Sequence, residues 1–217
     1  MTAPVILRAE REYVVCVKPP ATECEHELPA LLAPMLGCRA EELYCVHRLD
    51  RIVGGVMVWA RSKAAAASLG RQLQEHRLEK EYLAVCAGEP SPSEGDMLDL
   101  LYRDPAKQKA FAVKSPRRGV KEASLSYRVP ETLADASLSL VQIRLHTGRF
   151  HQIRCQFAAR GFPLAGDGKY GSRVKGCSAA LWCRRLTFYD PSDGARLTFQ
   201  APPPNVFPWS LFQAASQ

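Results

Sequence analysis

The order of apolar and polar positions along the chain predicts many short strands. Residues 12–18 are a β-branched and aromatic run that ends at two prolines, which predicts a strand that runs into a loop. From residue 122 to residue 129 apolar and polar residues alternate strictly, as expected of a strand with one buried face. Further strands are expected over residues 56–60, 78–87, 137–145, 181–189 and 195–200.

Two longer helices are predicted between these strands. Ser62 is a suitable N-cap for an alanine-rich helix that ends near His76, and its apolar residues recur at helical spacing. A second helix is expected from about Arg149 to Arg160, because Gly161 can adopt the left-handed conformation that ends helices.

The remaining segments predict loops and set the fold class. Residues 21–42 are expected to form a loop and a short helix, broken by Pro29 and Pro34, and residues 88–96 form a turn-rich connector. Strands and helices do not alternate regularly, which predicts an α+β fold with a mixed, largely antiparallel β-sheet and flanking helices and loops. Residues 1–217 suit a single domain, built either as one body or as two closely packed lobes.

The composition adds a partner and a compartment to this picture. The formal net charge of +7 and the pI of about 9.1 favour a polyanionic partner. None of the eight cysteines forms a C-x-x-C pair and most lie in apolar runs, as in a reducing compartment. The longest apolar stretch, residues 53–60, is too short to span a bilayer. We therefore expect a cytoplasmic protein without a membrane partner.

The sequence His-Arg-Leu-Asp-Arg at residues 47–51 is the first candidate for chemistry. Asp50 is flanked by two arginines and a histidine, whose positive charge would hold it ionised. Such an aspartate could be a nucleophile, a metal ligand or one half of an ordinary salt bridge, and the local sequence does not choose among these.

The helix after Thr147-Gly148 contains the second candidate. At 100° per residue, Phe150, Ile153, Arg154 and Phe157 fall within one narrow arc. Arg154 then lies on a buried face, where it needs an acidic partner, or at the edge of that face, from which it can reach water. The first alternative predicts a buried arginine–carboxylate pair without identifying the carboxylate.

The third candidate is a basic segment over residues 103–121. Its cations, against the single acid Asp104, are Arg103, Lys107, Lys109, Lys114, Arg117, Arg118 and Lys121. Such a run is often only a solvated surface. Tyr102 and Phe111 lie among the cations, however, and this mixture suits phosphate contacts together with base stacking. A loop or hairpin that faces nucleic acid is the alternative that we favour.

Two further motifs predict no ligand site. Residues 166–171 (Gly-Asp-Gly-Lys-Tyr-Gly) lack the spacing and the helix of a P-loop, and a turn is expected there. His146 and His151 are five residues apart with no matching cysteine or carboxylate, so no metal site is expected.

Taken together, these segments resemble the RluA-type RNA pseudouridine synthases. The resemblance rests on HRLDR at 47–51, LEKEYLAV at 78–85, LHTGRFHQIR at 145–154 and GFPLAGDGKYG at 161–171, which occur in the family's order and spacing. It covers essentially the whole chain. By this resemblance the fold is the catalytic domain of these synthases, without room for the separate N-terminal RNA-binding domain that many relatives carry.

The resemblance also implies roles for individual residues. Asp50 matches the catalytic aspartate that acts on the target uridine, Arg154 the basic residue that pairs with it, and Tyr82 the catalytic tyrosine that packs against the flipped base. Arg48 matches an arginine that fills the gap left by the extruded nucleotide, and Ile153 would line the uracil pocket. The other residues of these motifs expected to bind substrate are His47, Arg149, His151 and Gln152.

The implied reaction is the isomerisation of uridine to pseudouridine in structured ribosomal or transfer RNA, by a monomer that needs no metal or cofactor. The target base must leave the stack, because the reacting atoms are not accessible inside a helix. One departure is that Val53-Gly54-Gly55 stands where relatives have Thr-Ser-Gly. It leaves open an RNA-binding or chaperone-like protein with the same fold but no turnover. A glycosidic hydrolase is disfavoured, since no second carboxylate accompanies Asp50 in a motif.

Overall fold

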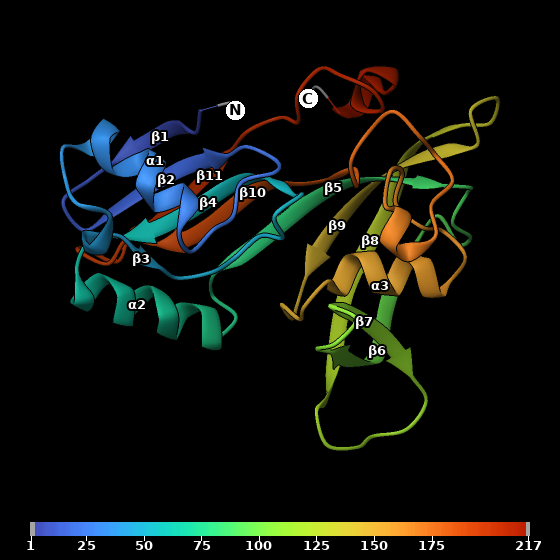
Figure 1. Cartoon of the computed structure of the whole chain (residues 1–217), viewed down its shortest axis with the longest axis horizontal. Coiled ribbons are helices and arrows are strands. Elements are labelled where there is room, and N and C mark those ends of the chain that lie inside the picture. The colour runs from blue at the N-terminus through green and yellow to red at the C-terminus, as the bar shows by residue number, and fades with distance from the viewer. Residues whose placement is uncertain (1–2, 216–217) are drawn as a thin grey trace. The chain divides into compact units, whose positions relative to one another are not determined.

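The computed structural model describes residues 3–215, which form two compact units, each with its own core (Figure 1). Unit 1 contains the described residues up to 80 together with residues 182–202, and unit 2 contains residues 81–181 and 203–215. The predicted α+β class with a mixed, largely antiparallel sheet is confirmed. Within the described residues, no helix is both long enough and apolar enough to cross a membrane.

The strands of unit 1 follow the order β1–β2–β4–β10, with β3 paired to β4 and β11 paired to β10. Their bounds are β1 Val5–Ala9, β2 Tyr13–Lys18, β3 Tyr44–Cys45, β4 Gly54–Ala60, β10 Leu181–Tyr189 and β11 Arg196–Gln200. The pairing of β4 with β10 is parallel, and the other pairings are antiparallel. The strands predicted over residues 12–18, 56–60, 181–189 and 195–200 are thereby confirmed.

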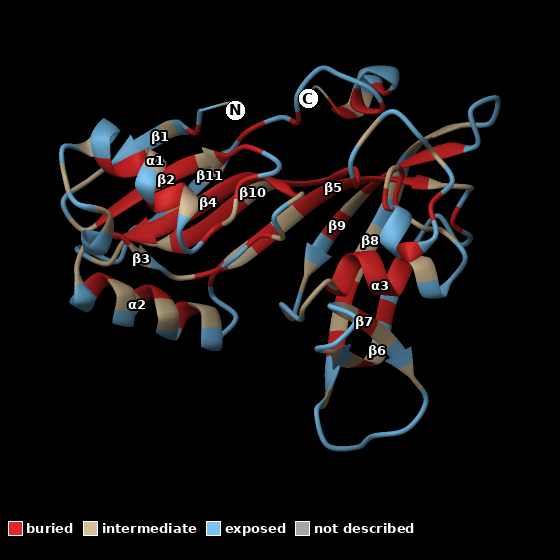
Figure 2. Cartoon of the chain, in the orientation of Figure 1, coloured by how far each residue is buried: buried red, intermediate tan, exposed pale blue. Residues whose placement is uncertain are grey.

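Helix α2 (Lys63–Gln74) covers one face of this sheet. Its Ala65 and Leu69 pack with Val15 of β2 and Val58 of β4 in a core that is fully or almost fully buried. The Oγ of Ser62 accepts the N–H of Ala65 at 3.1 Å, so the predicted N-cap is confirmed. Figure 2 shows β4 as buried along its whole length, consistent with a central strand.

Helix α1 (Glu27–Leu36) corrects the prediction that two prolines would break it. Pro29 lies in the first turn, where a backbone N–H has no partner within the helix, so the proline removes no hydrogen bond there. Pro34 does lie inside the helix. The burial of Leu28 and Leu32, both fully inaccessible to solvent, favours the helix over its interruption.

The glycine pair at the start of β4 is explained by β10. A Cβ on Gly54 would collide with the ring of Trp182 and would lie 2.9 Å from Cδ of Pro20. Gly55 has a φ of +126°, and its Cβ would meet the backbone of Cys183, with which it pairs. The tryptophan therefore occupies the space of a side chain at residue 54, and this packing accounts for the departure from Thr-Ser-Gly at Gly54.

Unit 2 contains the strand order β5–β9–β8–β6–β7. The bounds are β5 Glu79–Ala87, which begins in unit 1, β6 Glu94–Asp104, β7 Lys109–Val113, β8 Val120–Leu133 and β9 Leu138–Leu145. The predicted strands at 78–87, 122–129 and 137–145 are confirmed. The connector predicted over 88–96 is too long, because β6 begins at Glu94. Residues 103–121 contain the end of β6, the whole of β7 and the loop that leads to β8, and the hairpin of β6 and β7 is taken to include this loop.

Helix α3 (Gln152–Ala159) begins three residues later than predicted. Residues 149–151 form a turn instead, in which His151 has a φ of +52°. Gly161, with a φ of +85°, follows the helix as expected. Figure 2 shows α3 largely buried, and its Cys155 packs with Leu101 and Ala123 of the neighbouring strands.

We predict that Gly54→Ser lowers the free energy of unfolding by about 1–3 kcal/mol, because the new side chain overpacks against Trp182. Urea denaturation of the two single variants and of Gly54→Ser combined with Trp182→Leu measures this. The double variant should show favourable coupling, since the smaller side chain makes room. As a control, Gly70→Ala in α2 meets no atom within 4 Å and should not destabilise the protein. Purely additive effects of the two changes would contradict this explanation.

Candidate active site

The predicted site residues belong to both units. His47, Arg48 and Asp50 lie in unit 1, on the loop between β3 and β4. Tyr82 on β5 and the residues from Arg149 to Arg154 at the start of α3 lie in unit 2. The pairing of Asp50 with Arg154 that the resemblance implies stays a prediction.

Asp50 lies in a tight turn that leads into β4. Its carbonyl oxygen accepts the N–H of Val53 at 2.9 Å, and its side chain is half-buried. The preceding residue, Leu49, is buried and bonded on both sides to Cys24: its N–H donates to the Sγ at 3.4 Å, and the thiol donates to its carbonyl at 3.2 Å. These two bonds attach the backbone next to the candidate catalytic carboxylate to the buried Cys24.

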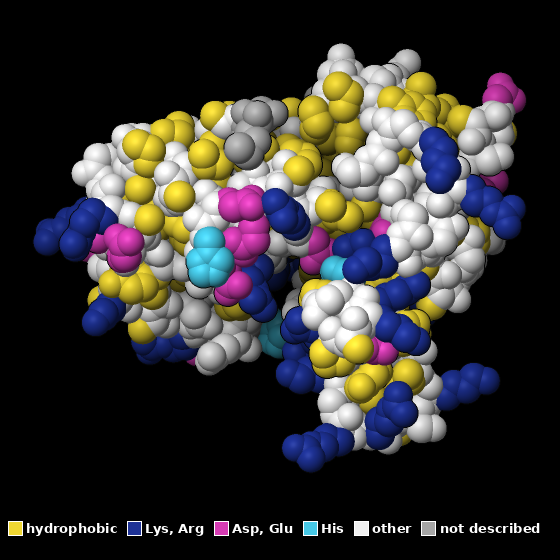
Figure 3. All heavy atoms as spheres, viewed as in Figure 1, with side chains coloured by type: hydrophobic (Ala, Val, Ile, Leu, Met, Phe, Trp, Pro, Cys, Tyr) yellow, Lys and Arg dark blue, Asp and Glu magenta, His cyan; other side chains and the backbone are white. Residues whose placement is uncertain are grey.

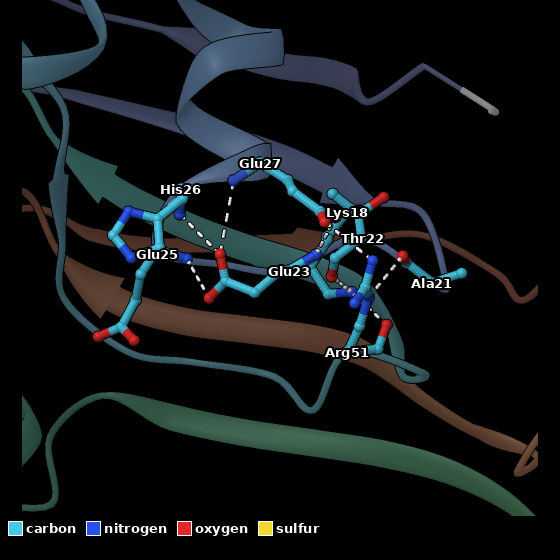
Figure 4. A network of polar contacts seen from close by, with 8 residues as sticks. All are labelled: Lys18, Ala21, Thr22, Glu23, Glu25, His26, Glu27 and Arg51. Carbon is cyan, nitrogen blue, oxygen red and sulfur yellow. Dashed lines mark hydrogen bonds and ion pairs between the residues drawn. The ribbon is translucent and has the colours of Figure 1, made fainter.

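A buried lysine contacts the same turn (Figure 4). Lys18, at the end of β2, is completely inaccessible to solvent. Its Nζ donates to the carbonyl oxygens of Pro19 (3.0 Å), Thr22 (2.8 Å) and Arg51 (3.2 Å). These three bonds join the loop after β2 to the residue that follows Asp50.

The charge of Lys18 reaches Asp50 as well. Burial lowers the pKa of Lys18 to about 8, and the nearby Cys24 and Asp50 act against this shift by favouring the ammonium. The side chain of Arg51 points to the same loop, with Nε donating to the carbonyl of Ala21 at 3.2 Å and Nη2 to Glu27 at 2.9 Å. The turn at Asp50 thus lies in a positive local environment.

The loop before α1 is shaped by Glu23, whose carboxylate turns back onto the backbone (Figure 4). It accepts the N–H groups of Glu25 (2.7 Å), His26 (2.6 Å) and Glu27 (3.4 Å). Burial acts to raise the pKa of Glu23, but these three N–H groups outweigh it and lower the pKa. An ionised Glu23 therefore begins α1 and places Glu27 for its contact with Arg51.

His47 occupies the interior and is 6% exposed. Burial, assisted by the charge of Lys80, lowers its pKa to about 3, so the ring is neutral at pH 7. Its Nε2 accepts the N–H of Val58 at 3.2 Å, which places the proton on Nδ1. Among the described residues, Nδ1 has no hydrogen-bond partner. The ring anchors the loop to β4, and the predicted role of His47 in substrate binding stays a prediction.

Arg48 points the other way. Its side chain is 61% exposed, and its Nη1 donates to Glu25 at 3.1 Å. An exposed ion pair of this kind contributes about 0–1 kcal/mol, so little free energy opposes its rearrangement. The exposure is compatible with the predicted insertion of Arg48 into RNA.

In unit 2, Arg154 forms a bidentate ion pair with Asp167. Nε lies 2.6 Å from one carboxylate oxygen and Nη2 lies 2.9 Å from the other, and the two side chains are 4% and 1% exposed. The prediction that Arg154 is buried and paired with a carboxylate is confirmed. Asp167 was not predicted as a site residue, since its motif was interpreted only as a turn. That turn exists, as a 3₁₀ turn at Gly168–Tyr170.

The neighbouring residues of α3 have mainly structural contacts. The amide of Gln152 accepts from the hydroxyl of Thr147 (2.8 Å) and the N–H of Arg149 (3.0 Å), and donates to the carbonyl of Ser124 (3.0 Å). Arg149 donates from Nε to the carbonyl of Glu122 at 2.8 Å. These bonds shape the turn before α3, and the predicted contacts of Gln152 and Arg149 with RNA stay predictions.

Tyr82 and Ile153, the predicted base-contacting residues, are both buried. Tyr82 on β5 is 5% exposed and Ile153 at the start of α3 is 3% exposed. Tyr170, which was not predicted as a site residue, lies beside α3 with its ring 5.1 Å from the guanidinium carbon of Arg154. A sequence signal for Asp167 and Tyr170 existed, because both belong to the GDGKYG stretch that carries part of the resemblance.

Comparison with known proteins identifies the family. Residues 12–159 match the family described as RNA pseudouridylate synthase. The chain belongs to the RNA pseudouridylate synthase family. Within the matched range lie Asp50, Tyr82 and Arg154, whereas Asp167 and Tyr170 lie beyond it.

Individual members of the synthase family support this assignment. The chain is 38% identical over 161 residues to the dual-specificity RNA pseudouridine synthase RluA of Escherichia coli. This alignment covers 72% of each sequence. It is 34% identical over 172 residues to an uncharacterized RNA pseudouridine synthase of Aquifex aeolicus. This alignment covers 75% of this chain but only about half, 54%, of that protein. The RluA-type resemblance is thereby confirmed.

The fold comparison agrees. The structure of human RNA pseudouridylate synthase domain containing 1 matches with a TM-score of 0.79 at 25% identity, covering 94% of this chain and 84% of that chain. Because this match covers more of the chain than residues 12–159 do, the synthase fold extends beyond that range.

We predict that Asp167→Ala lowers the free energy of unfolding of this synthase-family protein by about 3–5 kcal/mol, because it removes the bidentate carboxylate that compensates the buried guanidinium of Arg154. Chemical denaturation measures this. Glu10→Ala is the control, since it breaks an exposed pair with Arg8 and should cost less than about 1 kcal/mol. Equal losses in the free energy of unfolding would show that the buried pair stabilises the protein no more than the exposed pair does.

Proposed function

We propose that this protein is an RNA pseudouridine synthase that isomerises uridines in structured RNA. The observation that carries the proposal is the family match, which includes Asp50, Tyr82 and Arg154. In the reaction, the bond between N1 of uracil and C1′ of ribose breaks, the base rotates, and C5 bonds to C1′. The proton on C5 is lost and N1 gains one, so the net change is an isomerisation.

The proposed roles follow from the chemistry of each side chain. Asp50, beside the positive charge of Lys18, attacks the sugar or abstracts a proton. Arg154 is held in one orientation by Asp167, which pre-organises its positive charge. Tyr82 packs against the flipped base, and Arg48 fills the space that the base leaves. The buried contacts of Lys18 and His47 support this proposal because they keep the turn at Asp50 in place.

The hairpin of β6 and β7 is the proposed RNA-binding surface. Lys and Arg side chains project from this end of unit 2 (Figure 3). Aromatic rings support several of the cations: Arg103 lies 4.3 Å from the ring of Phe150, and Arg117 lies 4.7 Å from the ring of Tyr102. Such cations keep their orientation and can contact phosphates, while a purely solvated run would not need the rings.

The finer features of the proposal are the substrate and the setting. We propose structured ribosomal or transfer RNA as the substrate, and a monomer that acts in the cytoplasm. The net charge of +7 supports a polyanionic substrate of this kind. A protein that binds RNA without turnover is the alternative, but its motivation weakens because the packing of Trp182 explains Gly54.

The decisive experiment concerns Asp50. We predict that the wild-type protein forms pseudouridine in unmodified ribosomal or transfer RNA, whereas Asp50→Asn binds the same RNA and forms none, because the amide is neither nucleophile nor base. Carbodiimide modification followed by primer extension maps the product. Asp96→Asn, at an exposed position on β6, is the matched control and should retain activity.

The other outcomes separate the alternatives. Binding of these RNAs without any pseudouridine in the wild type would replace the synthase by an RNA-binding protein. Release of free uracil would instead indicate a glycosidic hydrolase. Pseudouridine formation by Asp50→Asn at the wild-type rate would remove Asp50 from the mechanism.

The hairpin generates a separate prediction. Changing Lys107, Lys114, Arg117 and Arg118 to glutamine should weaken RNA binding. It should also reduce the dependence of log K on log salt, by about 0.7–0.9 for each phosphate that the protein no longer neutralises. Filter binding over a range of salt concentrations measures both quantities. The control changes four exposed cations of unit 1, which are Arg11, Lys63, Arg71 and Arg77. Equal weakening of RNA binding in both variants would reduce the hairpin to a non-specific contributor of charge.

A further inference from the structure

The histidine before α3 is held in an unusual and well-defined position. His151 has a φ of +52°, in the left-handed region that residues other than glycine rarely adopt. Its ring stacks on Phe150, with the centroids 3.8 Å apart and 18° between the planes. Tyr170 meets the same ring edge-on at 5.6 Å and 75°. Backbone strain and packing on two sides together indicate an imidazole whose orientation matters.

The hydroxyl of Tyr170 joins this imidazole to the basic hairpin. Its oxygen accepts the N–H of Ala110, on β7, at 2.8 Å, and lies 3.0 Å from Nδ1 of His151. Over residues 3–215 these are its two hydrogen-bond partners. Burial raises the pKa of Tyr170, so the hydroxyl keeps its proton.

The position of that single proton decides the tautomer of His151. A hydroxyl has one hydrogen, and the contact with Ala110 uses the oxygen as an acceptor, so the hydrogen remains for Nδ1. In the reverse arrangement Nδ1–H would donate and the hydrogen of the buried hydroxyl would lack an acceptor, at a cost of about 1–3 kcal/mol. In an imidazole that carries one proton, the first arrangement places that proton on Nε2.

We propose that Tyr170 is a positioning residue that holds His151 as the Nε2–H tautomer, so that the imidazole donates a hydrogen bond to an oxygen of the substrate RNA. The functional half of this inference rests on the proposed synthase activity. RNA presents oxygen acceptors in its phosphates and in the carbonyl groups of uracil. An Nε2–H group attracts such an oxygen, whereas an unprotonated Nε2 repels it. The hydroxyl of Tyr170 therefore decides whether His151 attracts or repels an oxygen of the RNA.

Two sets of contacts connect the hairpin to His151. Ala110 of β7 bonds to the Tyr170 hydroxyl, and Arg103 of β6 lies 4.3 Å over Phe150, which stacks on His151. The proposed phosphate-binding surface and His151 therefore depend on the same contacts, through Tyr170 and Phe150. RNA bound to the hairpin would contact the element that also orients the imidazole.

The tautomer can be measured without RNA. In protein labelled with ¹⁵N-histidine, long-range ¹H–¹⁵N correlation spectra distinguish a protonated from an unprotonated ring nitrogen. We expect Nε2 of His151 to be protonated and Nδ1 not, with the signals assigned by their disappearance in His151→Gln. His47 serves as an internal reference of opposite type, because its Nε2 accepts from Val58 and its proton lies on Nδ1.

Tyr170→Phe removes the hydroxyl and keeps the ring. We expect the signals of His151 to shift to a mixture of the two tautomers, and kcat/KM for pseudouridine formation to fall about fivefold, the worth of one hydrogen bond. The control is Tyr127→Phe, which removes a hydroxyl that donates to the carbonyl of Pro92 at 2.9 Å elsewhere in unit 2. It should leave both the His151 signals and kcat/KM unchanged.

Three results would overturn the inference. They are a proton on Nδ1 of His151 in the wild type, unchanged His151 signals in Tyr170→Phe, and altered signals without any change in kcat/KM. The wild-type spectrum tests the tautomer even if Tyr170→Phe fails to fold. A wild type with the expected spectrum that forms no pseudouridine would count against the synthase activity and leave the tautomer assignment standing.

Discussion

The architecture around Asp50 depends on the burial of one ammonium group. A charged lysine without access to solvent is tolerated only where hydrogen-bond acceptors replace its hydration. Lys18 obtains them from three backbone carbonyls, and all three lie outside its own strand. The loop after β2 and the turn at Asp50 must therefore close around it. A local requirement of solvation thereby becomes a constraint on the backbone near the candidate catalytic residue.

Unit 2 solves the same problem in a different way. Arg154 is also buried, but a carboxylate rather than a set of carbonyls satisfies it. The pair formed with Asp167 is neutral overall, whereas the three carbonyls around Lys18 place an ammonium group beside Asp50, although burial lowers its pKa to about 8. The first arrangement fixes the direction of a guanidinium, and the second supplies a field that favours a carboxylate. Each suits the role proposed for its neighbourhood.

Sequence patterns predicted the elements whose signal is local. The alternation over 122–129 and the N-cap at Ser62 are such signals. The role of Asp50 in the HRLDR motif stays a prediction. Asp167 was not predicted as a partner of Arg154, because this pair depends on a tertiary contact between α3 and the turn after it. Helix α1 continues through Pro34 because burial of its apolar face outweighs the local preference. The strained backbone of His151 could not be predicted, since only packing against Phe150 and Tyr170 reveals it.

The hairpin has a second consequence, which concerns the unpaired side of β7. This strand ends the order β5–β9–β8–β6–β7, so one row of its backbone groups has no neighbouring strand within the described part of unit 2. The Tyr170 hydroxyl accepts the N–H of Ala110 and so covers one position of this edge. An uncovered edge is a template for the addition of a strand from another molecule, and charged side chains along it oppose that addition. Lys109 begins β7 and Lys114 follows it directly. Cations suited to contacting phosphates would thus also discourage aggregation when no RNA is bound.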